Sequence, residues 1–340
     1  MHDLYSDTKT KPTRAMREAM LDAPVGDEQK FEDPTTIALE ERVADLMGKE
    51  AAIFLPSGTM CNQIAVHLHT RPGDEIICDR TCHIVNSEAG GASAFSGVAP
   101  RLLDGVNGVY QPDQVVEAIR PRSRYIPRSS LLCAEQTANM GGGRVWPVET
   151  LIAVAETAKE AGLATHLDGA RLLNAVVASG ISARDHCAAY DSCWLDFTKG
   201  LGAPVGAVLA GSSDFIDSAW DLKQRTGGSM RQSGVIAAMC IHALDHHVDR
   251  LADDHKLAQH IAAEIVTMKG AGALLPVDTN IIIFDLTEDA PDAPALVECM
   301  KADGFVIGAF GPRRIRIVTH LDVDPAAGEA LIAALRRHIG

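Results

Sequence analysis

Lys199 lies in the stretch LDFTKGLGAPVG (195–206), between an apolar run typical of a strand and a series of glycines. Lysine is rarely buried unless it is paired or used chemically. In a partly desolvated site its amine can form a Schiff base with a carbonyl compound. The glycines and Pro204 predict a tight turn between two strands and argue against an exposed loop lysine, which is the alternative interpretation.

The same loop does not match a nucleotide-binding motif. Its glycines are spaced G-x-G-x-x-x-G, one residue longer than the dinucleotide pattern, and the loop leads into a strand instead of a helix. It also lacks the G-x-x-x-x-G-K order of a phosphate-binding P-loop. We therefore reject both nucleotide interpretations.

Polar residues also follow three other predicted strands, where open α/β sheets bind their ligands. Asp168 ends the strand ATHLD and is followed closely by Arg171, while Ser57-Gly58-Thr59 opens a helix whose first N–H groups could bind an anion. His83 lies shortly after the strand DEIICD. A salt-bridged strand end, an ordinary helix cap and a structural histidine are the respective alternatives.

Two further segments offer guanidinium groups, which suit bidentate recognition of a carboxylate or phosphate. Arg231 lies beside glycines in TGGSMRQSG, and Arg316 shares one face of a predicted strand with Arg314. The thirteen histidines lack the ligand spacing and the cysteine partners that indicate zinc. We expect no catalytic metal.

Strands and helices alternate from residue 51 to residue 211, which predicts a mainly parallel sheet covered on both faces. A second α+β pattern occupies the C-terminal part. We expect an N-terminal arm (1–12), a large domain (13–248) and a small C-terminal α+β domain (249–340). The strands expected are 51–55, 74–79, 100–103, 129–135, 164–168, 193–198, 205–211, 280–286, 305–310 and 314–320. The helices expected are 12–22, 34–47, 57–70, 147–162, 293–303 and 325–339, with a long helical stretch at 233–270.

Composition narrows the function classes. The net charge is −14 and the acidic residues are scattered, so we expect neither nucleic acid nor a membrane as a partner. The charged start MHDLYSDTKTKP is unlike a signal peptide, and the eight dispersed cysteines contain no CxxC pair. We expect a cytoplasmic protein with reduced thiols.

An imine-forming lysine, an acid for a ring nitrogen, N–H-rich turns with arginine and a ring-stacking histidine together suit an aldehyde cofactor bound as a Schiff base. The chain resembles the pyridoxal-phosphate-dependent threonine aldolases of the β-eliminating lyase family, which have the aminotransferase-like fold (fold type I). The motifs that carry the resemblance are LYSDTKTKP, APVGDE, EDPT, GKEAAIFLPSGTMCNQIA, HLDGARLLNA, TKGLGAPVG, TGGSMRQSG and IRIVTHLD.

The resemblance implies that Lys199 binds the aldehyde of pyridoxal 5'-phosphate, that Asp168 partners the ring nitrogen and that His83 stacks on the ring. Arg231 is expected to reach the phosphate from a neighbouring subunit, so we expect at least a dimer and, by resemblance, a tetramer. The expected cofactor contacts are Gly58, Thr59, His83, Asp168, Arg171, Lys199 and Arg231. The expected contacts of the substrate carboxylate are Ser6, Arg171 and Arg316.

The reaction implied is the cleavage of an L-β-hydroxy-α-amino acid, such as threonine or allo-threonine, to glycine and an aldehyde. A base must take the proton of the β-hydroxyl group. Two alternatives stay open: a lyase or deaminase that uses the same cofactor on a β-substituted amino acid, and a non-catalytic or nucleotide-binding α/β protein in which Lys199 is structural.

Three positions depart from the family pattern. Ala138 stands where many members carry a histidine near the substrate hydroxyl, which leaves His83 or a bound water as the candidate base. Lys30-Phe31 replaces a common Tyr-Gly pair, and Ser229 replaces a third glycine. Because these changes touch the side of the site that meets the substrate side chain, we predict a preferred aldehyde bulkier than acetaldehyde, with phenylserine as a candidate substrate.

Overall fold

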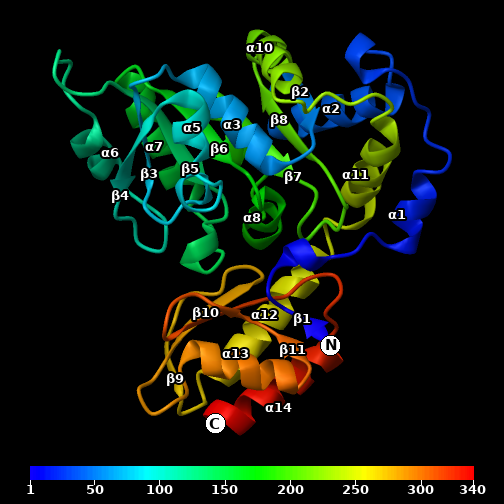
Figure 1. The fold of residues 1–340 in the computed structure, drawn as a ribbon, viewed down its shortest axis with the longest axis vertical. Helices are drawn as coiled ribbons and strands as arrows, with labels where there is room; N and C mark the ends of the chain where they lie inside the picture. Colours follow the sequence, from blue (N-terminus) through cyan, green and yellow to red (C-terminus); the bar gives the residue numbers. More distant parts are fainter.

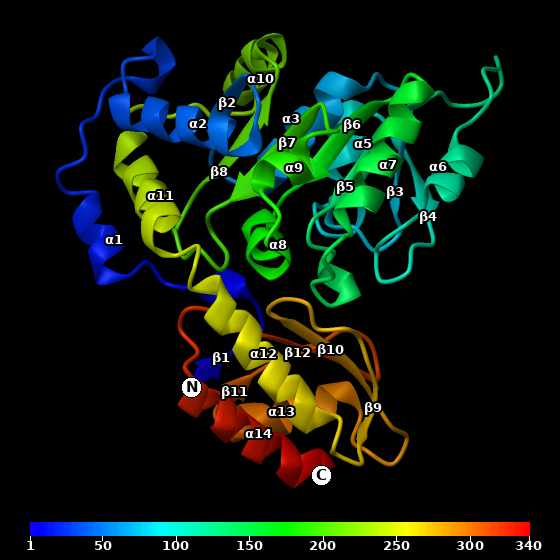
Figure 2. The ribbon, with the colours of Figure 1, turned by 180° about the vertical axis from the view of Figure 1, so that it is seen from behind.

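The structure is a computed structural model that describes residues 1–340. A seven-stranded sheet with helices on both faces forms the larger body, and a four-stranded sheet with three helices forms the smaller one below it (Figure 1). Both chain termini lie in the smaller body (Figure 2). No helix has both the length and the apolar character that a membrane span requires.

The larger body has a mixed sheet in the order β2-β8-β7-β6-β5-β3-β4, in which β8 alone is antiparallel to its neighbours. The strands are β2 (Ala51–Leu55), β3 (Glu75–Asp79), β4 (Ala99–Leu103), β5 (Ser129–Glu135), β6 (Ala164–Asp168), β7 (Ser192–Asp196) and β8 (Ala207–Gly211). The mainly parallel sheet is as predicted. It brings the carboxyl ends of β3, β5, β6 and β7 to one edge, where ligands bind in such sheets.

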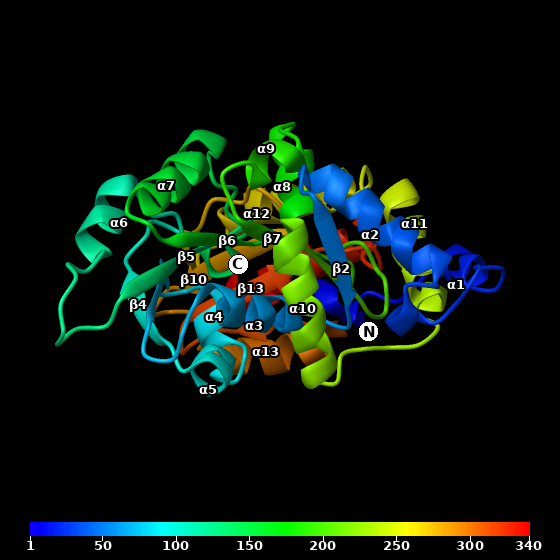
Figure 3. The same cartoon turned by 90° about the horizontal axis from the view of Figure 1, so that it is seen from above.

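Helices cover both faces of this sheet because its strands are apolar on both sides. Leu131 and Cys133 pack into one core cluster, whereas Leu132 and Ala134 between them pack into another. Helices α3, α5 and α10 lie on one side and α2, α7 and α9 on the other (Figure 3). The helices of this body are α1 (Arg14–Ala19), α2 (Pro34–Met47), α3 (Gly58–His69), α4 (His83–Asn86), α5 (Gly91–Ser96), α6 (Pro112–Ala118), α7 (Val148–Glu160), α8 (Leu172–Ser179), α9 (Ala183–Cys187), α10 (Ser213–Arg225) and α11 (Gly234–His246).

The smaller body is an antiparallel sheet in the order β12-β13-β10-β9, packed against three helices around its own core. Its elements are α12 (Leu251–Ile265), β9 (Ala271–Leu274), β10 (Ile281–Leu286), α13 (Ala293–Ala302), β11 (Phe305–Val306), β12 (Gly308–Ala309), β13 (Arg314–Val318) and α14 (Pro325–Ile339). The segment 305–310, expected as one strand, is divided at Ile307 between two sheets. The helical stretch 233–270 is broken between α11 and α12.

The N-terminal segment is built into the smaller body. Strand β1 (His2–Asp3) pairs with β11, and Leu4 lies in the small core. After it come the short 3-10 helix η1 (Asp7–Lys9) and α1, which begins later than the expected helix 12–22 because Thr13 caps it, and which ends at Ala19. The two further 3-10 helices are η2 (Glu28–Lys30) and η3 (Asn139–Gly141). The division at 248/249 stays a proposal, supported by the two separate cores.

Candidate active site

Three acidic residues end neighbouring strands on the same face of the large sheet. Glu135 ends β5, Asp168 ends β6 and Asp196 ends β7, and the first two are register partners. Side chains alternate along a strand, so each acid shares the face of the residue two positions earlier. Those residues, which pack or hydrogen-bond toward α3, are Cys133, His166 and Trp194. The sheet thus gathers three carboxylates beneath one helix.

Lys199 lies just beyond this row. Its Nζ forms a close ion pair with Asp196 and lies 5.6 Å from the centroid of the Trp194 ring, and its side chain is 15% exposed. The turn after it is tight, with a positive φ at Gly202, and Thr10 donates to the Lys199 carbonyl at 2.9 Å. The Lys199 amine is therefore mostly shielded from solvent, just beyond the end of β7.

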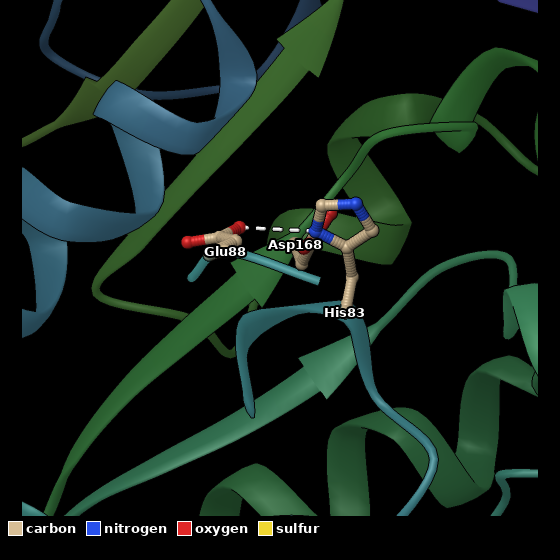
Figure 4. Close-up of side chains that lie close together, drawn as sticks. All are labelled: His83, Glu88 and Asp168. Atoms are coloured by element: carbon tan, nitrogen blue, oxygen red, sulfur yellow. Dashed lines mark hydrogen bonds and ion pairs between the residues drawn. The ribbon is translucent and has the colours of Figure 1, made fainter. Parts of the chain in front are cut away.

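Asp168 belongs to a polar cluster with Glu88, which is also buried, and with His83, which is partly exposed (Figure 4). One Asn62 amide nitrogen donates to Asp168 at 2.9 Å and to Glu88 at 2.7 Å, and His83 Nδ1 lies 3.1 Å from Glu88 Oε1. The hydrogen bond to Glu88 raises the pKa of His83, and burial raises that of Asp168. Sequence reasoning identified His83 and Asp168 but missed Asn62 and Glu88.

Two hydrogen-bond donors orient the side-chain amide of Asn62. Its Oδ1 accepts from Trp194 Nε1 at 2.8 Å and lies 3.0 Å from His166 Nε2. Burial lowers the pKa of His166 to about 3, so its ring is neutral. The amide of Asn62 is therefore oriented with its NH2 group toward the two acids. A buried Asn on the apolar side of a predicted helix was the signal that could have revealed it.

Arg171 reaches the site with its charge already paired. Its Nε and Nη2 donate to the two oxygens of Asp7 at 2.7 and 2.6 Å, and Asn280 donates to the same carboxylate at 3.1 Å. Burial alone would raise the pKa of Asp7, but Arg171, Lys199 and Arg316 hold it well below its usual value. The expected role of Arg171 in binding the substrate carboxylate stays a prediction.

Arg316, in contrast, is a buried cation with no acidic partner. Its Nη2 donates to Asn139 Oδ1 at 2.8 Å, its Nη1 lies 3.4 Å from the Tyr5 carbonyl and its Nε has no partner. Burial and the nearby Arg171 lower its pKa to about 10, so it stays protonated at neutral pH. A buried guanidinium that no carboxylate contacts is costly and favours an anionic ligand.

Ser6 lies next to Asp7, at the start of η1. Its side-chain oxygen accepts from the backbone N–H of Thr8 at 3.2 Å and from the Thr8 hydroxyl at 2.9 Å. The residue is buried and caps η1. Ser6 therefore shares the neighbourhood of the two arginines, and its expected contact with substrate stays a prediction.

The Ser57-Gly58-Thr59 turn opens α3, and Ser57 caps it by accepting from Met60 N at 3.3 Å. The first N–H groups of a helix have no acceptor within the helix. A Cβ at Gly58 would lie 2.1 Å from the Trp194 ring, so packing requires glycine there. Ser57 and Thr59 line a groove of about 440 Å³.

The remaining sequence-predicted residue, Arg231, is not among the residues that line this groove. Its side chain is 61% exposed and pairs with Asp27 at 3.0 Å. The structure therefore brings His83, Asp168, Lys199, Arg171 and Arg316 to one region, but it does not bring Arg231 there within a single chain.

The three departures from the family pattern have distinct surroundings. Ala138 is buried, and its methyl group lies 2.7 Å from where a Cβ on Gly108 would be, so a backbone turn packs directly against it. Phe31 has a φ of 57°, in the left-handed region that favours glycine, and is 63% exposed with its edge against Trp220. Ser229 has a buried hydroxyl without a partner.

Comparison with known proteins shows the family of the chain. Residues 3–289 match the family described as β-eliminating lyase. The chain is 43% identical over 326 residues to the low specificity L-threonine aldolase of Escherichia coli K12, with 95% of each chain covered. It is 41% identical to the low-specificity L-threonine aldolase 1 of Arabidopsis thaliana, covering 94% of this chain and 90% of that one.

Solved structures give the fold independently of close sequence similarity. A threonine aldolase from Leishmania major superposes with a TM-score of 0.86 at 20% identity, covering 99% of each chain. An aspartate aminotransferase from Thermus thermophilus superposes with a TM-score of 0.75 at 16% identity, covering 99% of this chain and 96% of that one. The predicted aminotransferase-like fold of type I is confirmed. The chain belongs to the β-eliminating lyase family.

Proposed function

We propose that the protein is a pyridoxal 5'-phosphate-dependent aldolase that cleaves L-β-hydroxy-α-amino acids, threonine and allo-threonine among them, to glycine and an aldehyde. The observation that carries the proposal is Arg316, a buried cation without an acid, in the same cluster as the Lys199 amine. A guanidinium near an amine suits an amino-acid ligand, whose carboxylate binds the guanidinium while the rest of the ligand lies beside the Lys199 amine. The names of the E. coli and A. thaliana relatives support the reaction class.

The donor set fits this cofactor. Lys199 offers an amine for the aldehyde, and the buried carboxylate of Asp168, held by Asn62, suits a protonated ring nitrogen. The unpaired N–H groups of Gly58 and Thr59 suit a phosphate. When bound, the cofactor supplies an electron sink for the pair released when the Cα–Cβ bond breaks.

The residues of the chain then have separate tasks. Arg316 binds the substrate carboxylate through Nε and one terminal nitrogen, which orients the amino acid at Cα. Asp168 would hold a positive charge at the ring nitrogen by its own negative charge. His83 would cover the ring, and its hydrogen bond to Glu88 fixes the imidazole plane. Arg171, neutralised by Asp7, supports Asn139, the partner of Arg316.

We also propose that the enzyme is a homo-oligomer, at least a dimer and by family resemblance a tetramer, in which Arg231 serves the phosphate site of a neighbour. The exposure of Arg231 and its absence from the residues that line the groove beside Thr59 support this assignment. The test is complementation. Coexpressed Arg231→Ala and Lys199→Ala chains should form mixed dimers with one intact site and measurable activity, whereas a site within one chain gives none.

A cytoplasmic location is proposed as well, and the eight cysteines, all of them free, support it. Fractionation of cells that express the protein at natural levels tests this. The enzyme should appear with the cytoplasmic marker, and its appearance in a secreted fraction would contradict the proposal.

The reaction is tested by product analysis with threonine, allo-threonine and phenylserine. Glycine and an aldehyde support aldol cleavage, whereas ammonia and a keto acid would indicate β-elimination or deamination. Borohydride reduction followed by peptide mapping should place the cofactor adduct on Lys199, and the Lys199→Ala variant is the control. Absence of any adduct in protein purified with the cofactor refutes the assignment.

The finer proposal is a preference for a bulky side chain such as that of phenylserine. Ala138 presents only a methyl group, although the Gly108 turn packs against it and fills part of the adjoining space. The ratio of kcat/KM for phenylserine to that for threonine measures the preference. A clear preference for threonine contradicts it.

A further inference from the structure

Glu135 is the one acid of the strand-end row that has no assigned task. Its side chain is buried, and its two oxygens accept from the backbone N–H groups of His83 at 2.6 Å and of Asn139 at 2.7 Å. No cationic side chain is bonded to it. Glu135 thus lies between the residue expected to cover the ring and the residue that holds Arg316.

A small cavity adjoins this carboxylate. Its polar lining is Glu135, Asp79, Thr81 and Tyr110, Ala138 lies beside them, and its volume is about 10 Å³. The Asp79 carboxylate is already bonded, because one oxygen accepts from Thr81 and the other from the backbone N–H of Gly105. That volume holds about one water molecule, and the polar lining offers the partners that a buried water requires. Ala138 also lines the cavity, and the family resemblance puts this position near the substrate hydroxyl.

The electrostatic surroundings suit a group that exchanges a proton. Burial and the neighbouring Asp168 raise the pKa of Glu135 to about 7, while the two backbone hydrogen bonds and His83 oppose the rise. The charged and titratable side chains that face it are Asp168 on β6, His83 on α4, Arg171 before α8, Arg316 on β13, and Asp79, Cys82 and Tyr110 around the cavity. A carboxyl group near neutrality suits general base catalysis.

His83 is less suited to this task. Its Nδ1 is engaged by Glu88, and that hydrogen bond raises the pKa of the imidazole, which favours the protonated ring. A protonated ring cannot accept the hydroxyl proton. Of the two acids near His83 other than Asp168, Glu88 is committed to Asn62, Gln63 and His83 by side-chain hydrogen bonds, whereas Glu135 borders the cavity.

We propose that Glu135 accepts the proton of the substrate β-hydroxyl through a single water molecule in the cavity beside Ala138. The inference rests on the proposed aldolase function. The hydroxyl O–H bond breaks, the water takes that proton and gives one of its own to Glu135, and the electron pair stays on the substrate oxygen, which becomes the aldehyde oxygen. Because Cα of glycine gains one proton, Glu135 can return to its ionised form within the cycle.

The test is the pH dependence of kcat/KM for threonine cleavage. Glu135 must be ionised to act, so activity should fall as the pH decreases through about 7. This fall in kcat/KM at low pH is the acid limb of the profile. In His83→Asn the acid limb should remain and move to higher pH, because the positive charge of His83 lowers the pKa of Glu135. In Glu135→Gln the limb should disappear and kcat should fall about 100-fold or more.

Cofactor affinity, measured by fluorescence titration, separates chemistry from folding. It should change by less than about threefold in Glu135→Gln, and the exposed Glu117→Gln variant should keep both the limb and the rate. If Glu135→Gln fails to fold, the His83→Asn profile decides. Loss of the limb in a cofactor-loaded His83→Asn variant overturns the inference, as does a limb that persists in Glu135→Gln. A wild-type enzyme that releases no glycine refutes the proposed function itself.

Discussion

Replacing Arg316 with methionine should abolish most substrate recognition without weakening the fold. Methionine matches the length of the arginine stem but lacks the guanidinium. In the native chain the Nε of Arg316 has no partner and Nη1 makes only a long contact to the Tyr5 carbonyl, so two N–H groups are available to a carboxylate. Substrate binding is therefore the interaction that the substitution removes.

The magnitude follows from the character of those bonds. Hydrogen bonds to charged groups contribute about 1.5–3 kcal/mol each. Removing a bidentate pair, with water replacing part of the lost interaction, should therefore cost about 2–4 kcal/mol of substrate binding. Since 1.4 kcal/mol is tenfold, kcat/KM for threonine should fall by roughly 30- to 1000-fold. The unfolding free energy of Arg316→Met should equal or exceed that of the native chain, because a buried charge without an acidic partner is removed.

The assay is a coupled measurement of aldehyde release, with chemical denaturation of the same preparations. Arg314→Met is the matched control: it lies on the same strand, but its side chain is 42% exposed and pairs with Asp285. That variant should keep kcat/KM within about twofold. The reasoning is refuted if Arg316→Met keeps kcat/KM within threefold of the native value, or if Arg314→Met loses as much.

Three further predictions concern stability and cofactor binding. Lys223→Met leaves Glu28 buried without its partner and should lower the unfolding free energy by about 3–5 kcal/mol in urea denaturation, and a loss under 1 kcal/mol contradicts this. Gly58→Ala places a methyl against Trp194, so cofactor affinity measured by absorbance titration should fall at least about tenfold, and an unchanged affinity counts against the turn as the phosphate site. Asp7 has a lowered pKa in the folded state, so its stabilisation is present above its ordinary pKa of 3.8 and is lost as the pH falls below it. In Asp7→Asn the unfolding free energy should therefore fall less steeply as the pH decreases. An unchanged slope of unfolding free energy against pH below pH 4 argues against this role of Asp7.

The elements of the fold were largely predictable because their signals are local. The strand 129–135 and the helix 325–339 have the observed bounds, since apolar runs, caps and prolines act within a few residues. The strand order was not predictable. The antiparallel insertion of β8 between β2 and β7 and the pairing of β1 with β11 join segments far apart in the chain. Two-residue strands such as β1 carry no periodicity that a sequence can show.

The residues of the candidate site also divide into those that the sequence predicted and those that only the structure revealed. His83, Asp168 and Lys199 were predicted as a group because chemistry-bearing side chains after parallel strands meet at one edge. Glu88, Asn62 and Asp7 were missed. Each is defined by a partner distant in sequence, as when Asn62 bonds to Asp168, 106 residues away.

What the sequence by itself determined is the inventory: an amine at a strand end, acids and arginines near it, the fold class and the family. The tertiary structure decided which charges are already paired. It joins Arg171 to Asp7 across 164 residues and leaves Arg316 without an acid. The physical reason is that a buried charge must be compensated by whatever group the packing brings within hydrogen-bond distance, and that group is set by the assembled fold rather than by neighbours in the chain.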